Sequence, residues 1–336
     1  MILEERIVAF EQIGDIFLNF KDDTSFEAIF AQAQLENSWF VASSIEYALL
    51  SLGHMLEPTK LRNWIGRYQM NNKIKKIGVI NSSNIPLVGF YDFFCVLLSG
   101  NVYVGKLSSS NQVLLPFVAT LLCKINPKFK NRIFFQENLS NTDLIIATGN
   151  DNTADHFRYM FKNQHKIIRN NRNSIAVIEG CESVEDYIKL SQDIFMYFGL
   201  GCRSVSKIFL PESFKVKNIR SLIQYDHEFT SNQFYMDNYH YQKALLITNN
   251  TPFHNLGNLL LVESPLFNSP ISVLYYEYYQ SIDNLSNIIR VNQEKIQCVV
   301  SNNSSFKNRV PFGRTQQPSL ADAPDGVDVM KFILES

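Results

Sequence analysis

Cys202 is the residue of this chain whose surroundings best suit nucleophilic chemistry. It lies in the segment Gly199-Leu-Gly-Cys-Arg-Ser, between an expected helix and an expected strand over residues 207–210. The two glycines permit a tight turn that leaves the thiol and its own N–H facing a cleft, and Arg203 favours the reactive thiolate. On these residues alone, a small buried hydrophobic cysteine is the more frequent alternative.

Three polar segments follow expected strands, where ligands of α/β proteins commonly bind. Asn81-Ser-Ser-Asn84-Ile-Pro86 offers an amide that can donate to a developing oxyanion, although asparagine before a proline-bearing helix start is also a common cap. The segment 100–111 brings Lys106 and three serines to a strand end, which suits phosphate or ribose as well as a capped turn. Thr148-Gly-Asn-Asp-Asn-Thr153 can cover a pyrophosphate, but it is not a G-x-G-x-x-G motif and also reads as a plain turn.

Composition and charge exclude several classes of protein. Of the 336 residues, 46% are hydrophobic and 19% are charged, and the net charge of −1 gives no basic field for nucleic acid. Five cysteines without a C-x-x-C pair, and six histidines without metal-ligand spacing, argue against a metal site and fit a reduced cytoplasmic protein. The N-terminus is unlike a secretory signal, and the nearly apolar run 85–98 is too short to span a membrane.

The order of the expected elements in the first half indicates helices followed by a parallel α/β sheet. Residues 1–73 read as helices, with an apolar stripe at Val41, Ile45, Leu49 and Leu52. Beyond residue 74, short β-branched strands alternate with helices, as in βαβ units. The expected strands cover 77–80, 102–104, 133–135 and 144–147, and the expected helices cover 87–98 and begin after 111 and near 153.

A second α/β region is expected around Cys202. Ser183 is a plausible N-cap for a helix that ends at Gly199. Further strands are expected over 207–210, 259–262, 271–276 and 297–300, and the last thirty or so residues are expected to fold back over the body.

In order and rough spacing, these segments resemble the aldehyde dehydrogenase superfamily. The pattern runs Asn-x-Pro, then Gly-Asn-(x)4-Lys-x-Ser-Ser, then Thr-Gly-Asn, then Gly-x-x-Cys-(x)4-Lys. The residues from Gly199 to Ser206, together with the tail Phe312-Gly-Arg-Thr-Gln-Gln-Pro-Ser, look still closer to the LuxC-type acyl-CoA reductases. The resemblance covers about residue 74 to the end.

The resemblance implies an α/β, aldehyde-dehydrogenase-like fold with a Rossmann-type cofactor domain, an α/β catalytic domain and a helical N-terminal segment. The corresponding boundaries are a helical segment over 1–73, a dinucleotide-binding domain over 74–180, a catalytic thiol domain over 181–305 and a C-terminal segment over 306–336 that folds back. The implied reaction is reduction of an acyl thioester, with a long-chain acyl-CoA or an acyl carrier as donor, to an aldehyde. A homo-oligomer is compatible with this reading.

The same resemblance assigns roles to residues that match the family pattern. Cys202 becomes the acyl acceptor, and Asn84 with the Cys202 N–H becomes the oxyanion hole. The cofactor-binding positions are Lys106, Ser108, Ser109, Thr148, Gly149 and Asn150. NADPH is the expected cofactor, because NAD-selective relatives carry a glutamate at the place of Ser109 and no such carboxylate is present to repel a 2′-phosphate.

Two departures from the superfamily pattern bear on the chemistry. Oxidative members carry a glutamate before a Gly-Gly-Lys segment, whereas the stretch Ile168-Arg-Asn-Asn-Arg-Asn-Ser174 has no acid. The tail Leu320-Ala-Asp-Ala-Pro-Asp-Gly326 lacks the histidine of some relatives. Two alternatives stay open: a γ-glutamyl-phosphate-type reductase acting on acyl phosphates, and a catalytically silent scaffold with the same fold.

Overall fold

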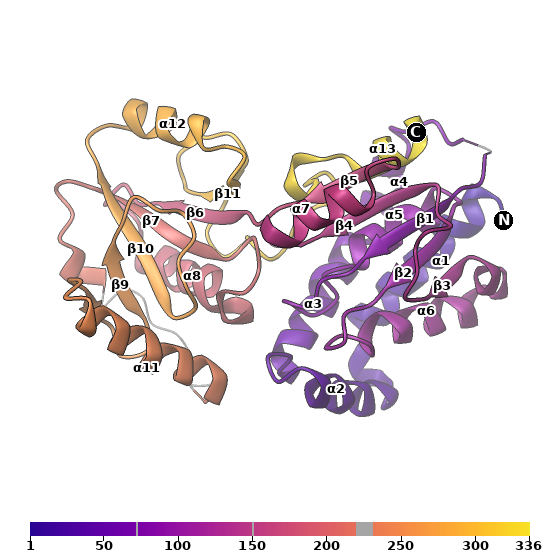
Figure 1. The fold of residues 1–336 in the computed structure, drawn as a ribbon, viewed down its shortest axis with the longest axis horizontal. Helices are drawn as coiled ribbons and strands as arrows, with labels where there is room; N and C mark the ends of the chain where they lie inside the picture. Colours follow the sequence, from indigo (N-terminus) through magenta and orange to yellow (C-terminus); the bar gives the residue numbers. More distant parts are fainter. Residues whose placement is uncertain (72, 150, 220–230) are drawn as a thin grey trace. The chain divides into compact units, whose positions relative to one another are not determined.

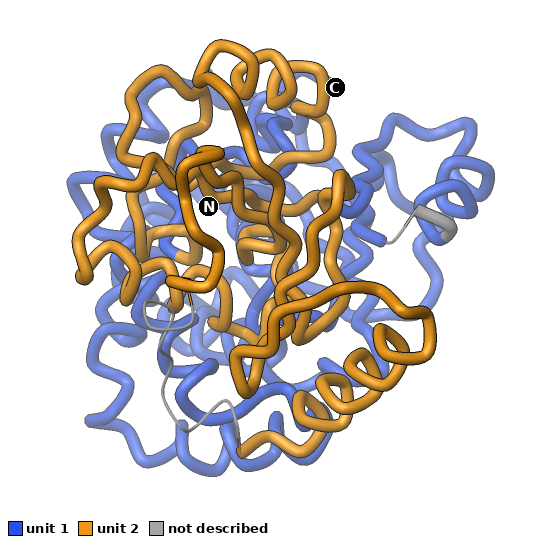
Figure 2. The backbone as a smooth tube through the Cα atoms, turned by 90° about the vertical axis from the view of Figure 1, so that its left-hand side faces the viewer, with its two compact units in different colours: residues 1–171, 317–336 blue, residues 172–316 orange. Residues whose placement is uncertain are grey.

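The computed structural model describes residues 1–71, 73–149, 151–219 and 231–336. Figure 2 shows the chain divided into two compact units. Unit 1 comprises residues 1–171 and 317–336, and unit 2 comprises residues 172–316. The C-terminal segment therefore divides at residue 316, with its last twenty residues belonging to unit 1.

Unit 1 is built on a five-stranded parallel sheet, labelled in Figure 1. Its strands are β1 (Lys76–Ile80), β2 (Val102–Lys106), β3 (Ile133–Phe135), β4 (Leu144–Thr148) and β5 (His165–Arg169), in the order β3-β2-β1-β4-β5. The first four strands confirm the sequence prediction, while β5 was not expected. Because the strands are parallel, the segments that follow them share one edge, and the order of strands reverses between β1 and β4.

Alternate residues of these strands face two different groups of helices. Ile77 and Val79 face a large core formed with α1 (Leu3–Leu18), α5 (Phe90–Leu98) and α6 (Leu114–Ile125). On the opposite face, Val104, Ile145 and Ala147 pack with Phe161 and with Phe157 of α7 (Asp151–Met160). Both faces are thus covered, as parallel sheets require.

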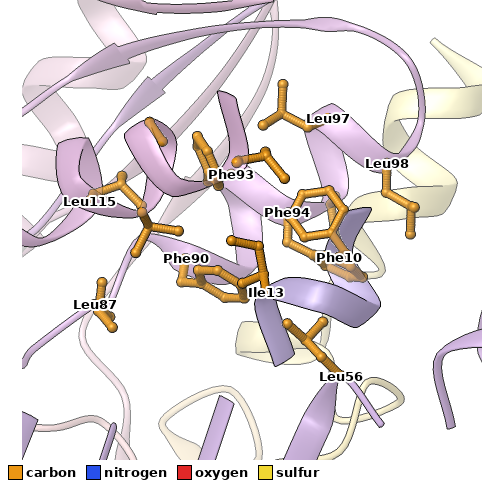
Figure 3. Close-up of a cluster of buried hydrophobic side chains, with 14 of the residues drawn as sticks. Phe10, Ile13, Leu56, Leu87, Phe90, Phe93, Phe94, Leu97, Leu98 and Leu115 are labelled. Carbon is orange, nitrogen blue, oxygen red and sulfur yellow. The ribbon is translucent and has the colours of Figure 1, made fainter. Parts of the chain in front are cut away.

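Aromatic side chains fill the core between α1 and α5, as Figure 3 shows. Phe10 meets Phe94 edge to face with ring centroids 5.0 Å apart, and Phe90 stacks on Phe94 at 6.3 Å. The other N-terminal elements are α2 (Ser25–Glu36), α3 (Ala42–Met55), α4 (Pro58–Ile65) and the short η1 (Phe20–Asp22). The expected apolar stripe of α3 is confirmed, since Ile45 and Leu49 are buried.

The helix after β1 begins later than the sequence suggests. A helix was expected from Leu87, but α5 begins at Phe90. Leu87 has φ of +55°, a left-handed conformation that a helical residue cannot adopt. The backbone turns there and only then enters the helix.

Unit 2 holds a seven-stranded sheet in the order β12-β11-β6-β7-β10-β9-β8, parallel except for β8 against β9. Its strands are β6 (Asn173–Val177), β7 (Val205–Pro211), β8 (His254–Asn255), β9 (Leu260–Glu263), β10 (Val273–Tyr279), β11 (Ile296–Val300) and β12 (Arg309–Val310). Figure 1 shows α12 (Ile282–Val291) on one face, with α8 (Val184–Phe195) and α11 (Gln233–Thr248) on the other. The expected strands near 207, 259, 271 and 297 are confirmed.

Helix α8 starts where the sequence predicts and ends earlier. The Ser183 side chain accepts a hydrogen bond from the Asp186 N–H, and the Asp186 carboxylate accepts one from the Ser183 N–H, which makes a capping box. The helix ends at Phe195 rather than Gly199, and a short 3-10 segment, η3 (Met196–Gly199), takes over. The change of conformation at η3 sets the course of the chain into the Cys202 turn.

Three short elements and one helix complete the described structure: η2 (Pro127–Asn131), η4 (Val216–Asn218), η5 (Pro324–Gly326) and α13 (Val329–Glu335). Val329, Met330 and Ile333 of α13 join the core of unit 1, which anchors the end of the chain. Within the described ranges, no helix combines the length and the apolar character needed to cross a membrane.

The core of unit 1 makes a direct prediction about stability. Phe94→Ala should lower the free energy of unfolding by about 3–5 kcal/mol, because a fully buried ring leaves a cavity. The matched control is Phe134→Ala, since Phe134 is 47% exposed and its loss should cost less than about 1 kcal/mol. Urea unfolding of both variants checks this, and equal losses would contradict the described core.

Candidate active site

Three consecutive residues with left-handed backbone precede Cys202. Tyr197, Phe198 and Gly199 have φ of +56°, +57° and +76°. Such a conformation costs roughly 1–2 kcal/mol for each residue that carries a Cβ, so the buried rings of Tyr197 and Phe198 must hold it in place. The chain is reversed sharply, and the Cys202 side chain is exposed at the turn before β7.

The backbone of the turn is fixed from β6. The hydroxyl of Ser174, which is fully buried, donates to the Cys202 carbonyl at 3.1 Å and lies 3.0 Å from the Cys298 sulfur. Within the turn, the Ser204 N–H donates to the Gly201 carbonyl at 2.9 Å. The peptide that carries the candidate nucleophile is therefore oriented by hydrogen bonds on both sides of the cysteine.

Residues 313–316, which we call the clasp segment, lie against α8 and the Cys202 turn. The Asp193 carboxylate accepts hydrogen bonds from the Gly313 N–H at 2.7 Å, the Thr315 N–H at 3.1 Å and the Thr315 hydroxyl at 2.8 Å. The Arg203 Nε donates to the Thr315 carbonyl. The Gln316 amide donates to the Ser204 hydroxyl at 3.1 Å.

Asp193 was not predicted as a site residue. It is 2% exposed, on the same side of α8 as the buried Leu190 and Ile194. Burial raises the pKa of Asp193 to about 6, although the hydrogen bonds from Gly313 and Thr315 and the charge of Arg203 work in the opposite direction. The one signal in the sequence was an acid at a core position of an amphipathic helix.

In unit 1, the segments that follow β1 and β2 are joined by side-chain hydrogen bonds. The Ser83 hydroxyl accepts from those of Ser108 at 3.1 Å and Ser110 at 3.0 Å. Asn84 is half-buried, and its amide oxygen accepts from the Ser82 hydroxyl at 2.8 Å, which orients the amide. Asn84 and Ser108, predicted separately, are therefore each hydrogen-bonded to one of two neighbouring serines, Ser82 and Ser83, in the segment that follows β1.

Lys106 ends β2 and has a partner that sequence reasoning missed. Its ammonium group lies 3.1 Å from the Glu137 carboxylate, and the two side chains are 42% and 80% exposed. An exposed pair of this kind contributes about 0–1 kcal/mol, so an anionic ligand can displace Glu137. Ser109 is exposed beside the same strand end.

Thr148 is the last residue of β4 and is followed by Gly149; both lie beside Arg169, the last residue of β5. Arg169 donates to the Thr148 hydroxyl at 3.4 Å, and the Gly149 N–H donates to the Arg169 carbonyl at 3.3 Å. A Cβ at position 149 would lie 3.0 Å from the side chain of Thr153, so a larger residue would press on α7. Asn150, the last predicted cofactor-binding residue, lies outside the described residues.

Arg169 lies in the stretch 168–174, in which the resemblance led us to look for a glutamate, and its side chain forms a buried ion pair. Two hydrogen bonds of 2.6 and 2.8 Å join it to both oxygens of Asp92 on α5, and Asp325 lies 3.6 Å from its Nε. Burial opposes the charged guanidinium, but the Asp92 carboxylate more than compensates and raises the pKa of Arg169 above its ordinary value. This side chain is a structural cation and no base.

The carboxyl edge of the unit 1 sheet fits an extended ligand with phosphate and hydroxyl groups. The half-exposed Lys106 and the exposed Ser109 supply donors, and Gly149, directly after β4, has no side chain. Among the described residues, the buried amide oxygens of Asn81 and Asn111 have no hydrogen-bond donor, so the edge also holds unsatisfied acceptors. Donors and acceptors at the point where the strand order reverses are typical of dinucleotide sites. No group of acidic, histidine or cysteine side chains in the described part of the chain could hold a metal ion.

A family model described as acyl-CoA reductase (LuxC) matches residues 43–228, which is more than half of the chain. No curated protein matches the chain.

The fold resembles that of solved aldehyde dehydrogenases. The aldehyde dehydrogenase KauB from Pseudomonas aeruginosa is 11% identical with a TM-score of 0.64, over 92% of this chain and 78% of that one. The NAD-dependent aldehyde dehydrogenase from Sinorhizobium meliloti is 13% identical with a TM-score of 0.65, over 90% and 71%. The NAD+ complex of the aldehyde dehydrogenase from Bacillus cereus is 13% identical with a TM-score of 0.62, over 90% and 73%. These likenesses confirm the expected aldehyde-dehydrogenase-like α/β fold.

The buried Asp193 predicts a particular dependence of stability on pH. Its pKa of about 6 lies above the ordinary value of 3.8, so between about pH 4 and pH 6 the folded state binds a proton more tightly than the unfolded state. As the pH rises through this window, the free energy of unfolding of the wild type should therefore fall by up to about 3 kcal/mol relative to that of Asp193→Asn. Unfolding titrations of both proteins from pH 4 to pH 7 measure the difference. If the stability of the wild type relative to Asp193→Asn stays constant or increases as the pH rises, the pKa of Asp193 is not raised.

Proposed function

Because the chain belongs to the acyl-CoA reductase (LuxC) family of oxidoreductases acting on acyl thioesters, we propose that it reduces a long-chain acyl thioester to an aldehyde. NADPH is the proposed reductant, and CoA or a carrier thiol is the proposed leaving group. The observation that carries the proposal is the exposed Cys202 thiol in a strained turn whose backbone is fixed by Ser174. The proposed setting is the cytoplasm, where such thiols stay reduced.

The first chemical step transfers the acyl group to the protein. The Cys202 thiolate attacks the thioester carbon, the bond from that carbon to the CoA sulfur breaks, and CoA leaves as a thiolate that takes up a proton. The Cys202 N–H and the Asn84 amide are the proposed donors to the oxyanion, as the family pattern implies. The product of this step is an acyl thioester on Cys202.

The second step reduces that thioester. When bound, the nicotinamide cofactor supplies the hydride equivalent that this chain cannot supply itself. Breaking the bond between the reduced carbon and the Cys202 sulfur releases the aldehyde, and one proton from solvent restores the thiol. The residues proposed to bind the cofactor are Lys106, Ser108, Ser109, Thr148, Gly149 and Asn150.

Water should compete poorly for the acyl group. Hydrolysis needs a base to activate water, which is worth roughly 10²–10⁴-fold in rate. The stretch 168–174 has no acid, and Arg169 within it is held by Asp92. This ion pair supports an enzyme that retains its acyl group until reduction or until CoA returns.

NADPH is favoured over NADH by the charges at the end of β2. Lys106 can attract a 2′-phosphate, and Ser109 stands where NAD-selective relatives carry a glutamate. One charge-assisted contact of this kind contributes about 1–3 kcal/mol. The carboxylate of Glu137 opposes the preference for NADPH, because it repels a 2′-phosphate. Its exposed ion pair with Lys106 is weak, so the phosphate can displace Glu137 from Lys106.

Acyl transfer predicts a stable acyl-enzyme. Incubation with a long-chain acyl-CoA but no NADPH should add one acyl group to the peptide that contains Cys202, and the adduct should decay slowly. Peptide mass spectrometry measures both the position and the lifetime. Cys202→Ala should take up nothing, whereas Cys181→Ala, which removes another exposed cysteine, should behave as the wild type. Rapid release of free fatty acid without cofactor would show that a base exists.

Cofactor choice predicts opposite effects of two substitutions. Ser109→Glu should lower the preference for NADPH about tenfold or more, because it places a carboxylate beside the ribose. Glu137→Gln should raise that preference severalfold, because it removes the carboxylate next to Lys106. Dissociation constants for NADPH and NADH measure both effects without turnover. Tighter binding of NADH by the wild type, or no response to Ser109→Glu, would overturn the assignment.

A further inference from the structure

We propose that Asp193 is a positioning residue for Cys202, acting through the clasp segment, residues 313–316. Asp193 lies on α8, nine residues before Cys202 in the sequence, and does not itself contact the cysteine in any hydrogen bond described above. Its carboxylate fixes the clasp segment, and the clasp segment fixes the two residues that follow Cys202. The inference rests on the proposed function only in taking Cys202 as the nucleophile.

The first link is the carboxylate itself. Asp193 accepts three hydrogen bonds between 2.7 and 3.1 Å, one through Oδ2 from Gly313 and two through Oδ1 from Thr315. Thr315 is fully buried, so its N–H and its hydroxyl have no water to replace the carboxylate. An acceptor with two oxygens is required at this position, because an amide would turn an N–H group toward one of the donors.

Gly313 explains why the segment can approach α8 so closely. It has φ of +76°, which favours glycine, and a Cβ there would lie 3.0 Å from the Cβ and Cγ of Lys189 on α8. The segment is thus shaped to bring consecutive N–H groups to one carboxylate.

The second link joins the clasp segment to the turn. The Thr315 carbonyl accepts from the Arg203 Nε, and Gln316 donates to the hydroxyl of Ser204, which is 2% exposed. Arg203 and Ser204 are the residues immediately after Cys202, so holding them fixes the direction of the Cys202 peptide. The Ser174 hydroxyl on β6 also donates to the Cys202 carbonyl, so hydrogen bonds from both β6 and the clasp segment fix the backbone around the nucleophile.

A purely structural carboxylate on the same helix offers the matched control. Asp186 belongs to the capping box at the start of α8 and has no contact with the clasp segment among the hydrogen bonds described. Asp186→Asn should lower stability by about 1 kcal/mol, as loss of a cap does, without disturbing the Cys202 turn. Asp193→Asn makes the same chemical change at the carboxylate that binds the clasp segment.

The test measures acylation of Cys202 in a single turnover, as a function of acyl-CoA concentration, in the full chain. Asp193→Asn and Thr315→Val should each lower the maximum rate at least about fivefold, with the half-saturating concentration changed by less than about threefold, since a small misplacement of a reacting group slows chemistry without weakening binding. Thr315→Ser, which keeps the hydroxyl, should restore the rate. Asp186→Asn should leave both quantities unchanged.

A second measurement separates this proposal from the proposed function. Hydrogen exchange of the peptide covering residues 200–206 should accelerate in Asp193→Asn and Thr315→Val, and not in Asp186→Asn. If the wild type is not acylated, the proposed function fails and exchange alone decides the role of Asp193. Unchanged exchange in both variants, or equal slowing of acylation by Asp186→Asn, would overturn the proposal. Thr315→Val, which is isosteric, decides the matter if Asp193→Asn does not fold.

Discussion

The backbone before Cys202 follows a left-handed course that ordinary side chains resist. Two aromatic residues, Tyr197 and Phe198, adopt positive φ, and their strain is balanced only because both rings are buried. The thiol that follows is exposed at the end of this turn. The hydroxyl of Ser174 holds the Cys202 carbonyl, and the clasp segment, bound by the carboxylate of Asp193, holds the two residues that follow Cys202.

Unit 1 shows the same use of buried charge at the carboxyl edge of its own sheet. Arg169 and Asp92 are both almost fully buried, and a buried pair of this kind contributes little net stability, because removal from water offsets the attraction. Breaking the pair would nevertheless leave one charge uncompensated. The guanidinium of Arg169 also donates to the Thr148 hydroxyl, so the pair fixes the end of β4 next to the end of β5. The proposed retention of an acyl group rests in part on this commitment of Arg169 to Asp92.

Sequence patterns predicted the elements better than the contacts between them. The strand periodicity and turn residues predicted most of the described strands but not β5, β8 or β12, and Ser183 correctly marked the start of α8. The predicted end of α8 and the predicted start of α5 were wrong. The positive φ of Tyr197, Phe198 and Leu87 depends on tertiary packing, which no local pattern encodes. Asp193 was missed for the same reason: its partners lie about 120 residues away. Glu137, similarly, meets Lys106 only because β2 and β3 are adjacent.

In the proposed reaction, Cys202 takes an acyl group from a thioester, and NADPH then reduces that group to an aldehyde. The most direct measurement supplies a long-chain acyl-CoA with NADPH and quantifies cofactor oxidised, CoA released and aldehyde formed. The three amounts should be equal, and Cys202→Ala should form none of the products. CoA release that yields free fatty acid while NADPH is not consumed, or aldehyde formation that persists in Cys202→Ala, would contradict it.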